Sequence, residues 1–584
     1  MRRLLVYLKE YRLQCILAPL FKMLEASFEL IVPLVIASLI DKGIGGNDTR
    51  HIYLMTAILG VLAVIGLTVS LTAQFFAAKA AIGFSTKLRS ELFRHLLNLS
   101  YSEVDTIGTS TMITRMTSDV NQAQNGVNMF LRLFLRSPFV VFGAMIMAFT
   151  IDVHTALIFV VTIAVLFAVV GLIMSRNIPA LIKAQASLDK VTHSVREGLN
   201  GVRVIRAFRL EKDEIESFDN TTDELTNRLK NAGHISALMN PLTYVLINLG
   251  IILVIYSGGM RVSAGILTQG QVIALYNYMS QILVELVKLA NLVVTLNKAL
   301  ASADRISDVF AISPSMKEGM GVEPDMDVDD DALESDMDVG KEAVSFRDVS
   351  FTYPGSSEDS LENIDFVAYK GQTIGIIGGT GSGKSTVANL IARFYDVTGG
   401  GVYLFGHDIR DYSYDQLHEL VGVVMQKAVL FKGDVKSNLM MAAADATGEE
   451  LVTALKMAQA EEIVKDKGGM DSEVEQGGRN YSGGQRQRLS IARTLAMHTP
   501  ILILDDSSSA LDYATDLKLR RALKELDKNT TVFIISQRTS SIKHADKILV
   551  LDDGRLEAIG THEELLLSCE LYREIHNSQL HKQE

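Results

Sequence analysis

The chain has 584 residues, of which 48% are hydrophobic, and its mean hydropathy is +0.21. A soluble chain of this length rarely has a positive mean hydropathy, so long apolar segments are expected and a single soluble domain is excluded. Two cysteines exclude a disulfide framework and a multi-cysteine zinc site. The net charge of −12 arises mostly from ten acidic residues within 318–338, which leaves no basic footprint for nucleic acid.

The first 300 residues contain six apolar stretches, each able to supply the ~20 residues of a membrane-crossing helix. They run through about 14–40, 52–78, 127–150, 155–175, 242–262 and 271–296. Segments 1–13, 79–126 and 175–241 hold nineteen Lys and Arg residues, against three in the alternate connections 41–51, 150–155 and 257–271. This asymmetry predicts a multi-pass protein of the inner or plasma membrane with both termini in the cytoplasm. The first apolar stretch is too long for a cleaved signal peptide.

The connections 85–99 and 180–199 have helical patterns, which predict cytoplasmic extensions of the spans. Segment 311–342 contains two prolines, the acidic run and no aromatic residue. We interpret it as an exposed acidic linker or insertion, with a cation or lipid-headgroup sensor as the alternative. After it, short strand patterns alternate with helices. The predicted domains are therefore a transmembrane domain (1–310), the linker (311–342) and a nucleotide-binding domain (343–584).

A glycine-rich loop lies between an expected strand and an expected helix. The apolar run TIGIIG (373–378) leads into GGTGSGKS (378–385), and the helical run TVANLIARFY follows. This pattern fits the phosphate-binding loop G-x4-G-K-[ST]. Glycines let backbone N–H groups approach phosphates, Lys384 reaches the outer phosphates and Ser385 offers a hydroxyl to Mg²⁺. The expected nucleotide-binding residues here are Gly378, Thr380, Gly381, Ser382, Gly383, Lys384, Ser385 and Thr386.

A second strand pattern, PILILDD (500–506), ends in two carboxylates. Asp505 is the candidate carboxylate on the magnesium side of a nucleotide. The alternative is a strand end whose acidic groups are merely solvated, but this alternative weakens beside the phosphate loop.

A third motif, YSGGQ (481–485), precedes an Arg-rich helix and lies 15 residues before PILILDD. It resembles the signature of the ABC ATPases, with Tyr in place of the usual Leu. The resemblance implies that Ser482, Gly483, Gly484 and Gln485 contact the ATP of a partner chain. It also implies that Tyr353 stacks on adenine, that Gln426 links Mg²⁺ to the membrane domain and that Asp512 belongs to the SALD turn.

The first half resembles the membrane domain of ABC exporters. Segments 108–120 and 197–218 are similar to its two intracellular loops, where short coupling helices dock on the ATPase domains. The resemblance is closest to half-transporters of bacterial heterodimeric multidrug exporters. It implies an all-α membrane domain of six transmembrane helices with cytoplasmic extensions, followed by an α/β P-loop ATPase domain with a helical subdomain. ATP and Mg²⁺ are the implied cofactors.

Two residues depart from the family pattern. Asp506 stands where the family has a glutamate that polarises the attacking water, and its carboxylate is withdrawn by one C–C bond, ~1.5 Å. A ~1 Å misplacement of a catalytic group can cost ~100-fold in rate. Gln537 stands where the family has a histidine that contacts the γ-phosphate, and glutamine does not titrate near neutral pH. These two catalytic positions predict a degenerate nucleotide site that still binds ATP.

In the family, two cassettes face head to tail, and each ATP lies between one phosphate loop and the opposite signature. The weak loop and the intact signature of this chain therefore predict a heterodimer rather than a homodimer. The partner would be a second ABC half-transporter that supplies the hydrolysing site.

Ionisable residues within spans usually face a polar interior or a transport path. Glu25, Glu29 and Lys288 are the candidate cargo-path residues, with interhelical pairing as the alternative. For Arg132 and Arg136 we expect snorkelling to the inner membrane surface. The predicted function is export of small amphiphilic drugs. Export of lipid or peptide, and an ATP-binding membrane sensor, remain the alternatives.

Overall fold

The computed structural model describes residues 4–324, 342–507, 509–526 and 528–580, and the chain divides into two compact units. The first unit comprises Met1–Leu97 and Ser110–Ile312, and the second comprises Asn98–Thr109 and Ser313–Glu584. Each unit has its own hydrophobic core. The short segment 98–109 therefore packs with the C-terminal unit, although its flanking helices belong to the first.

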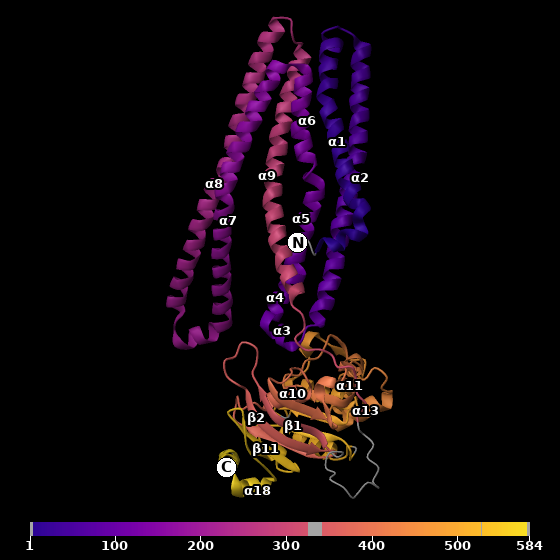
Figure 1. Ribbon diagram of the computed structural model, residues 1–584, viewed down its shortest axis with the longest axis vertical. Helices are drawn as coiled ribbons and strands as arrows, with labels where there is room; N and C mark the ends of the chain where they lie inside the picture. The colour runs from indigo at the N-terminus through magenta and orange to yellow at the C-terminus, as the bar shows by residue number, and fades with distance from the viewer. Residues whose placement is uncertain (1–3, 325–341, 508, 527, 581–584) are drawn as a thin grey trace. The chain divides into compact units, whose positions relative to one another are not determined.

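The first unit consists of helices joined by short turns and has no strand in its described residues, and Figure 1 shows α7 beside α8 and α1 beside α2. Six helical segments are long and apolar enough to cross a membrane, which confirms the expected six spans. They are Leu4–Ile44, Thr49–Leu97, Thr109–Ile151, Val153–Phe208, Glu211–Ser263 and Gln269–Ala311. In detail they consist of η1 (Leu4–Tyr11), α1 (Arg12–Ser38), η2 (Leu39–Ile44), α2 (Thr49–Leu97), α4 (Thr109–Thr114), η3 (Arg115–Asp119), α5 (Val120–Leu133), α6 (Arg136–Ile151), α7 (Val153–Phe208), α8 (Glu211–Ser263) and α9 (Gln269–Ala311).

Polar caps and small residues explain where these helices begin and how closely they pack. Asp152 accepts a hydrogen bond from the Thr155 backbone N–H at 2.8 Å and so caps α7. Thr268 begins α9 with a reciprocal capping box to Gln271. Buried alanines recur along α2, which lets neighbouring helices approach closely. The core contains Tyr278, whose hydroxyl donates to the Leu30 carbonyl at 2.6 Å.

The second unit contains the expected α/β domain. A six-stranded sheet has the order β12-β11-β3-β10-β9-β6, and a four-stranded antiparallel sheet has the order β2-β1-β4-β5. In the larger sheet β11, β3, β10, β9 and β6 are parallel. Its strands are β3 (Thr373–Gly378), β6 (Val421–Val424), β9 (Ile501–Asp505), β10 (Thr531–Ile535), β11 (Lys547–Asp552) and β12 (Arg555–Gly560). The smaller sheet consists of β1 (Glu342–Phe351), β2 (Leu361–Tyr369), β4 (Gly399–Leu404) and β5 (His407–Asp408).

Helices flank these sheets, and several of them form a helical subdomain whose buried cluster is shared with strands β6, β9 and β10. The remaining elements are α3 (Tyr101–Ile107), α10 (Lys384–Ile391), η5 (Ile409–Asp411), α11 (Tyr414–Leu420), β7 (Gly433–Asp434), α12 (Val435–Met440), α13 (Gly448–Met457), α14 (Glu461–Asp466), β8 (Glu473–Val474), η6 (Gln476–Gly478), α15 (Gly483–Leu495), α16 (Tyr513–Leu523), α17 (Thr539–Ile542), α18 (His562–Ser568) and α19 (Glu570–Leu580). Together these elements confirm the expected fold class.

The two segments that resemble intracellular loops differ from each other in local structure. Within the predicted segment 108–120 the short helix α4 and the helical turn η3 form, and a further short helix, α3, precedes them. In the second, 197–218, the described residues form the end of α7, a turn at Arg209 and Leu210, and the start of α8. Helical periodicity continues through both sides of that turn, so no separate short helix forms in this segment.

The predicted linker contains a segment that packs on the ATPase domain. The backbone N–H groups of Gly319 and Gly321 donate to the carbonyls of Tyr412 and Asp411, at 3.2 and 3.0 Å. The side-chain amide of Gln416 donates to the Val322 carbonyl at 2.7 Å. Residues 325–341, which hold most of the acidic segment 318–338, lie outside the described residues.

Candidate nucleotide site

The site lies at the carboxyl edge of the large sheet. β3 leads into the glycine-rich loop, β9 ends at Asp505, β6 is followed by Gln426, and β10 is followed by Gln537. Because β3, β10, β9 and β6 are adjacent and parallel, these four chain positions meet at one edge. Ligands of open α/β sheets bind at this edge. The sheet thus brings together residues that are far apart in sequence.

The loop needs glycine for conformation and for space. Gly381 and Gly383 have φ of +87° and +91°, which L-residues with side chains rarely adopt. A Cβ on Gly383 would lie 2.8 Å from the Ser360 carbonyl oxygen. These glycines allow the chain to curl before α10 begins at Lys384, so that the N-terminus of this helix faces the loop.

Lys384 lies within the loop and is buried. Its ammonium donates to the carbonyl of Gly378 at 3.1 Å and to that of Gly379, and it lies 3.3 Å from the Ser382 hydroxyl. Burial lowers the pKa of Lys384, while the nearby Asp506 and Asp505 charges oppose that shift. A phosphate group would supply the negative charge that a buried ammonium lacks.

Ser385 and Asp505 meet across 120 residues of sequence. The Ser385 hydroxyl donates to Asp505 Oδ1 at 3.0 Å. Burial raises the pKa of Asp505, and the charge of Asp506 adds to this effect. A buried carboxylate next to a second carboxylate is the environment that a bound cation stabilises most.

These oxygen donors fit a magnesium ion. Ser385, Asp505 and Gln426 would hold Mg²⁺, which prefers hydroxyl, carboxylate and amide oxygens together with phosphate oxygens. Within the described ranges no cluster of three or more His, Cys, Asp and Glu side chains could hold a metal.

Asp506 and Gln537 lie beside this group. Asp506 Oδ2 is 3.5 Å from the Gln426 side-chain nitrogen. The Gln537 side chain is exposed, whereas its backbone carbonyl accepts a hydrogen bond from Gln579 on α19 at 2.7 Å. The structure thus brings both unusual residues to the edge predicted for them.

Tyr353 is the expected adenine-stacking residue, and it is only partly buried. Its hydroxyl is 3.3 Å from the Thr386 hydroxyl and accepts a hydrogen bond from the Asn389 amide at 3.2 Å, both on α10. Its ring packs edge-on against Tyr395, with centroids 5.2 Å apart. Sequence reasoning missed Asn389 and Tyr395. The aromatic pair that follows the helical run, Phe394-Tyr395, is the signal that could have indicated them.

The YSGGQ motif lies in the helical subdomain. Tyr481 is buried in that subdomain's cluster, which explains how an aromatic residue replaces Leu. Ser482 caps α15 through a capping box with Gln485, and Ser482 and Gly483 are exposed. A Cβ on Gly484 would lie 2.8 Å from the Ala510 carbonyl oxygen. The motif therefore presents a polar helix N-terminus to solvent.

Asp512, in the SALD turn, has a local structural role. It caps α16 by accepting from the Thr515 backbone N–H at 2.9 Å and from the Thr515 hydroxyl at 2.8 Å. Those backbone and side-chain hydrogen bonds lower the pKa of Asp512. A nucleotide-binding role for this residue stays a prediction.

The candidate cargo-path residues form ion pairs within the first unit. Glu25 binds Lys22 at 2.5 Å, and Lys288 binds Glu285 at 2.8 Å. Glu29 binds Arg136 at 2.8 Å, and Arg136 also binds Glu285 at 2.5 Å. The snorkelling expected of Arg136 is wrong, because its side chain is only 6% exposed and bridges α1 and α9. The carboxylates of Glu29 and Glu285 hold the guanidinium inside the helix bundle and away from the membrane surface.

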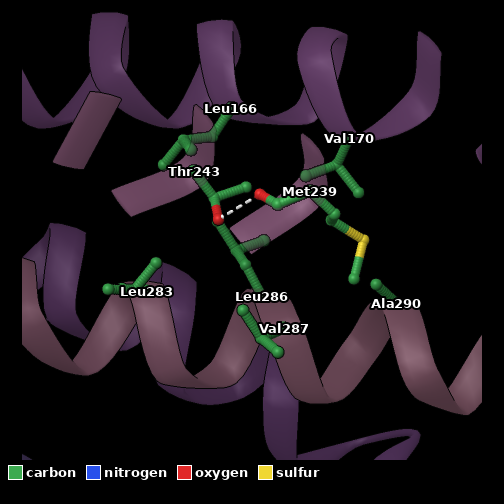
Figure 2. Close-up of a pocket in the computed structure, with 8 residues that line it drawn as sticks. All are labelled: Leu166, Val170, Met239, Thr243, Leu283, Leu286, Val287 and Ala290. Atoms are coloured by element: carbon green, nitrogen blue, oxygen red, sulfur yellow. Dashed lines mark hydrogen bonds between the residues drawn. The ribbon is translucent and has the colours of Figure 1, made fainter. Parts of the chain in front are cut away.

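Figure 2 shows a small cavity between α7, α8 and α9 in the same unit. Its volume of about 10 Å³ accommodates one water at most. Figure 2 marks a hydrogen bond from the Thr243 hydroxyl to the Met239 carbonyl, at 2.7 Å. The lining residues are Leu166, Val170, Met239, Thr243, Leu283, Leu286, Val287 and Ala290. This space is too small for a drug-sized cargo.

Comparisons with known proteins match both units. Residues 15–286 match the family model "ABC transporter transmembrane region", and residues 361–509 match the model "ABC transporter". The uncharacterized ABC transporter ATP-binding protein YfiB of Bacillus subtilis is 34% identical over 580 residues, which cover 99% of this chain and 98% of the relative. Rv1273c of Mycobacterium tuberculosis, also described as an ABC transporter ATP-binding protein, is 33% identical over 578 residues, 98% of this chain and 97% of the relative.

Two further comparisons extend this result. An ATP-dependent lipid A-core flippase of Yersinia pestis is 29% identical over 581 residues, which cover 99% of this chain and 97% of the flippase. The solved structure of a bacterial Atm1-family ABC exporter with ATP bound has the same fold, with a TM-score of 0.79 at 21% identity, over 97% of this chain and 98% of the exporter. Six apolar helices, a phosphate loop on a parallel sheet and full-length relatives therefore lead to one conclusion: the chain belongs to the ABC transporter family, as an exporter half-transporter that couples an ATP-binding ATPase domain to transport across a membrane.

Proposed function

We propose that this chain is the weak-site subunit of a heterodimeric exporter. Its own phosphate loop would hold ATP and hydrolyse it slowly, while its YSGGQ motif completes the hydrolysing site of a partner half-transporter. The observation that carries this proposal is the presence of Asp506 and Gln537 together at the carboxyl edge of the sheet.

The backbone around Asp506 cannot shift easily to compensate for the short side chain. Its N–H donates to the Ile535 carbonyl at 3.0 Å, and its carbonyl accepts from the Ser509 hydroxyl at 2.8 Å. Its φ of +42° is already unusual for a residue with a side chain. A carboxylate ~1.5 Å short of the position of a glutamate therefore stays short. The expected loss is ~100-fold or more in the rate of water attack.

Nucleotide binding depends on other residues, which keep the family pattern. Lys384 faces the phosphates, and Tyr353 stacks on adenine with its partly open ring. Ser385, Gln426 and Asp505 hold Mg²⁺. Gly378, Thr380, Gly381, Ser382, Gly383 and Thr386 complete the loop and the start of the helix. Binding without fast hydrolysis follows from keeping these groups while losing the glutamate and the histidine.

The excess of Lys and Arg in alternate connections supports a cytoplasmic ATPase domain and insertion in the inner or plasma membrane. Small amphiphilic drugs are the proposed cargo. Glu29 and Lys288 support a cargo contact, because each side chain is 41% exposed within the unit. Glu25 is held by Lys22 on the same helix, α1, so an ion pair within that helix is the better-supported role for that residue.

Lipid export is a second candidate, supported by the lipid A-core flippase that aligns with almost the whole chain. An assay in vesicles that contain this chain and its purified partner distinguishes the two candidate functions. Dye accumulation supports drug export, and loss of a labelled lipid from one leaflet supports lipid export. An ATP-binding sensor would do neither.

The heterodimer is tested by comparing this chain alone with the chain co-purified with a candidate partner that has Glu and His at the two positions. We expect steady-state phosphate release to be slow for the single chain and at least ~100-fold faster for the pair. Fast turnover by the single chain would contradict the proposal and favour a homodimer.

A further inference from the structure

Tyr395 lies between the adenine-stacking tyrosine and helix α3. Its side chain is 8% exposed, and it follows the helix that begins at Lys384 by four residues. On one side its ring packs edge-on against Tyr353, with an interplanar angle of 83°. On the other side its hydroxyl donates to Asp105 Oδ2 on α3 at 2.6 Å. One buried side chain therefore contacts both elements.

Tyr353 is held in place by its neighbours. Phe351 packs edge-on against it at 4.8 Å, and its hydroxyl meets Thr386 and Asn389 on α10. A base stacked on the open part of this ring would favour the one ring orientation that these contacts allow. Since Tyr395 packs against the same ring, that orientation also limits where the Tyr395 ring can lie.

Helix α3 is attached to this domain at several points along its length. The Ser100 hydroxyl at its N-terminus accepts from the Met316 backbone N–H at 3.2 Å. Tyr101 stacks on Phe394, with centroids 4.7 Å apart and an angle of 27°. Asp105 in its last turn accepts from Tyr395. Tyr101 also lies against the Tyr395 ring, with centroids 6.1 Å apart, so Tyr395 contacts α3 through its ring as well as through its hydroxyl. The Met316 and Phe394 contacts involve neither Tyr353 nor Tyr395, so Tyr395 is the residue through which nucleotide can influence α3.

The Tyr395–Asp105 bond is suited to this role. Burial, followed by the bond to Asp105, raises the pKa of Tyr395, so the hydroxyl remains a donor throughout the neutral range. Hydrogen bonds to a carboxylate are short and about twice as strong as neutral ones. Asp105 itself is exposed, so when the bond is broken its carboxylate is solvated at little cost. The bond can therefore form and break.

We propose that Tyr395 is a positioning residue that makes the seating of α3 depend on adenine stacking at Tyr353. The base, as well as the phosphates, would then control α3, which the chain joins directly to α2 on one side and α4 on the other. This inference rests on the proposed adenine contact of Tyr353. ATP shifts the equilibrium between seated and released α3 only if its affinity for the two states differs. The Tyr353 ring, which contacts both the base and Tyr395, supplies that difference.

Hydrogen–deuterium exchange of the peptide covering 98–109 tests the proposal, using the full-length chain in nanodiscs with saturating ATP and Mg²⁺. In the wild-type chain we expect ATP to slow exchange of this peptide ~5-fold or more, the lower range of typical coupling between sites. In Tyr395→Phe most of this protection should vanish, although ATP affinity stays within ~3-fold. Asp105→Ala should have the same effect, and the double variant should add nothing further.

Tyr412→Phe is the matched control. Tyr412 is fully buried in the same domain, and its hydroxyl donates to the Leu404 carbonyl at 2.6 Å, so this variant also loses one buried tyrosine hydroxyl bond. ATP should protect 98–109 in this variant as in the wild type. Absence of ATP protection in the wild-type chain, or full protection in Tyr395→Phe, would overturn the proposal.

Tyr353→Ala separates this inference from the proposed function. An unchanged ATP affinity in this variant would overturn the adenine contact itself. A weakened affinity supports the contact, and the exchange at an ATP concentration that restores saturation then tests the relay. Protection equal to that of the wild type would mean that the phosphates alone seat α3, and the role of Tyr395 would be refuted.

Discussion

Arg136 on α6 and Glu285 on α9 form an ion pair with 2.5 Å between the Nη1 and Oε1 atoms, although 149 residues separate them. Glu285 is 3% exposed and also accepts from Ser137 and Lys288. Through Glu29, the guanidinium reaches α1 as well. The two carboxylates and the two cations balance, so the network ties three helices together without carrying a net charge.

Arg136→Gln should destabilise the membrane domain, because it leaves the buried Glu285 carboxylate without its Arg136 partner. Breaking a buried pair in this way typically costs about 3–5 kcal/mol. Thermal unfolding of the full chain in nanodiscs, at one fixed scan rate, should show a clearly lower midpoint. Adding Glu285→Gln should recover part of the loss, since it removes the stranded buried charge.

Lys190→Gln provides the control for Arg136→Gln. It breaks the Lys190–Glu224 pair, which spans 3.3 Å between largely exposed side chains on α7 and α8. Exposed pairs contribute about 0–1 kcal/mol, so the midpoint should hardly move. Equal effects of the two variants would contradict a special role for the buried network.

Magnesium-dependent ATP binding should weaken on acidification at a higher pH than an ordinary aspartate would cause. The pKa of Asp505 is raised by burial and by the charge of Asp506, so as the pH falls Asp505 is protonated early and its metal-binding charge is lost. Asp506→Asn removes the second of these causes. The midpoint of the pH–affinity curve, measured with a fluorescent ATP analogue, should then move to lower pH. A midpoint that stays in place would argue against Asp505 as the titrating metal ligand.

Ser482→Ala should severely depress phosphate release by the heterodimer, because Ser482 would face the ATP in the partner's site. The change also removes a helix cap, a loss that typically costs 0.5–2 kcal/mol in stability. Ser413→Ala controls for this effect, because Ser413 caps α11 through the same kind of capping box, with Gln416. A matched, small loss of turnover in both variants would show that the head-to-tail assignment is wrong.

Asp506→Ala should leave substantial ATPase activity in the heterodimer, whereas removal of the matching glutamate from the partner should abolish most turnover. The Asp506 carboxylate is already too short to hold the attacking water well, and Gln537 cannot titrate as a histidine would. For the same reason, Asp506→Glu alone should not create a second fast site. Steady-state phosphate release from matched heterodimers measures the effect of Asp506→Ala, of Asp506→Glu and of removing the partner's glutamate. A ~100-fold loss in Asp506→Ala, ~2.7 kcal/mol in barrier, would show that this site is catalytic.

The amino-acid sequence by itself determined the six spans, the phosphate loop and the signature, because each depends on a local pattern of residues. TIGIIG forms β3 over the residues expected, and ILILD of PILILDD forms β9. Such segments depend on nearest-neighbour chemistry and on the period of the apolar residues. Ser385 and Asp505 were each expected beside Mg²⁺, but the hydrogen bond between them was not predicted and follows from parallel strands that end at one edge.

Only the tertiary structure decided which distant side chains meet. Arg136 was expected at the membrane surface, but the fold surrounds it with carboxylates from α1 and α9, and the Coulomb attraction of buried charges outweighs snorkelling. The sequence assigned no role to Tyr395, because its partner Asp105 on α3 lies 290 residues away in the chain. No local period encodes such contacts, because they arise when separate helices and strands bury their faces against one another.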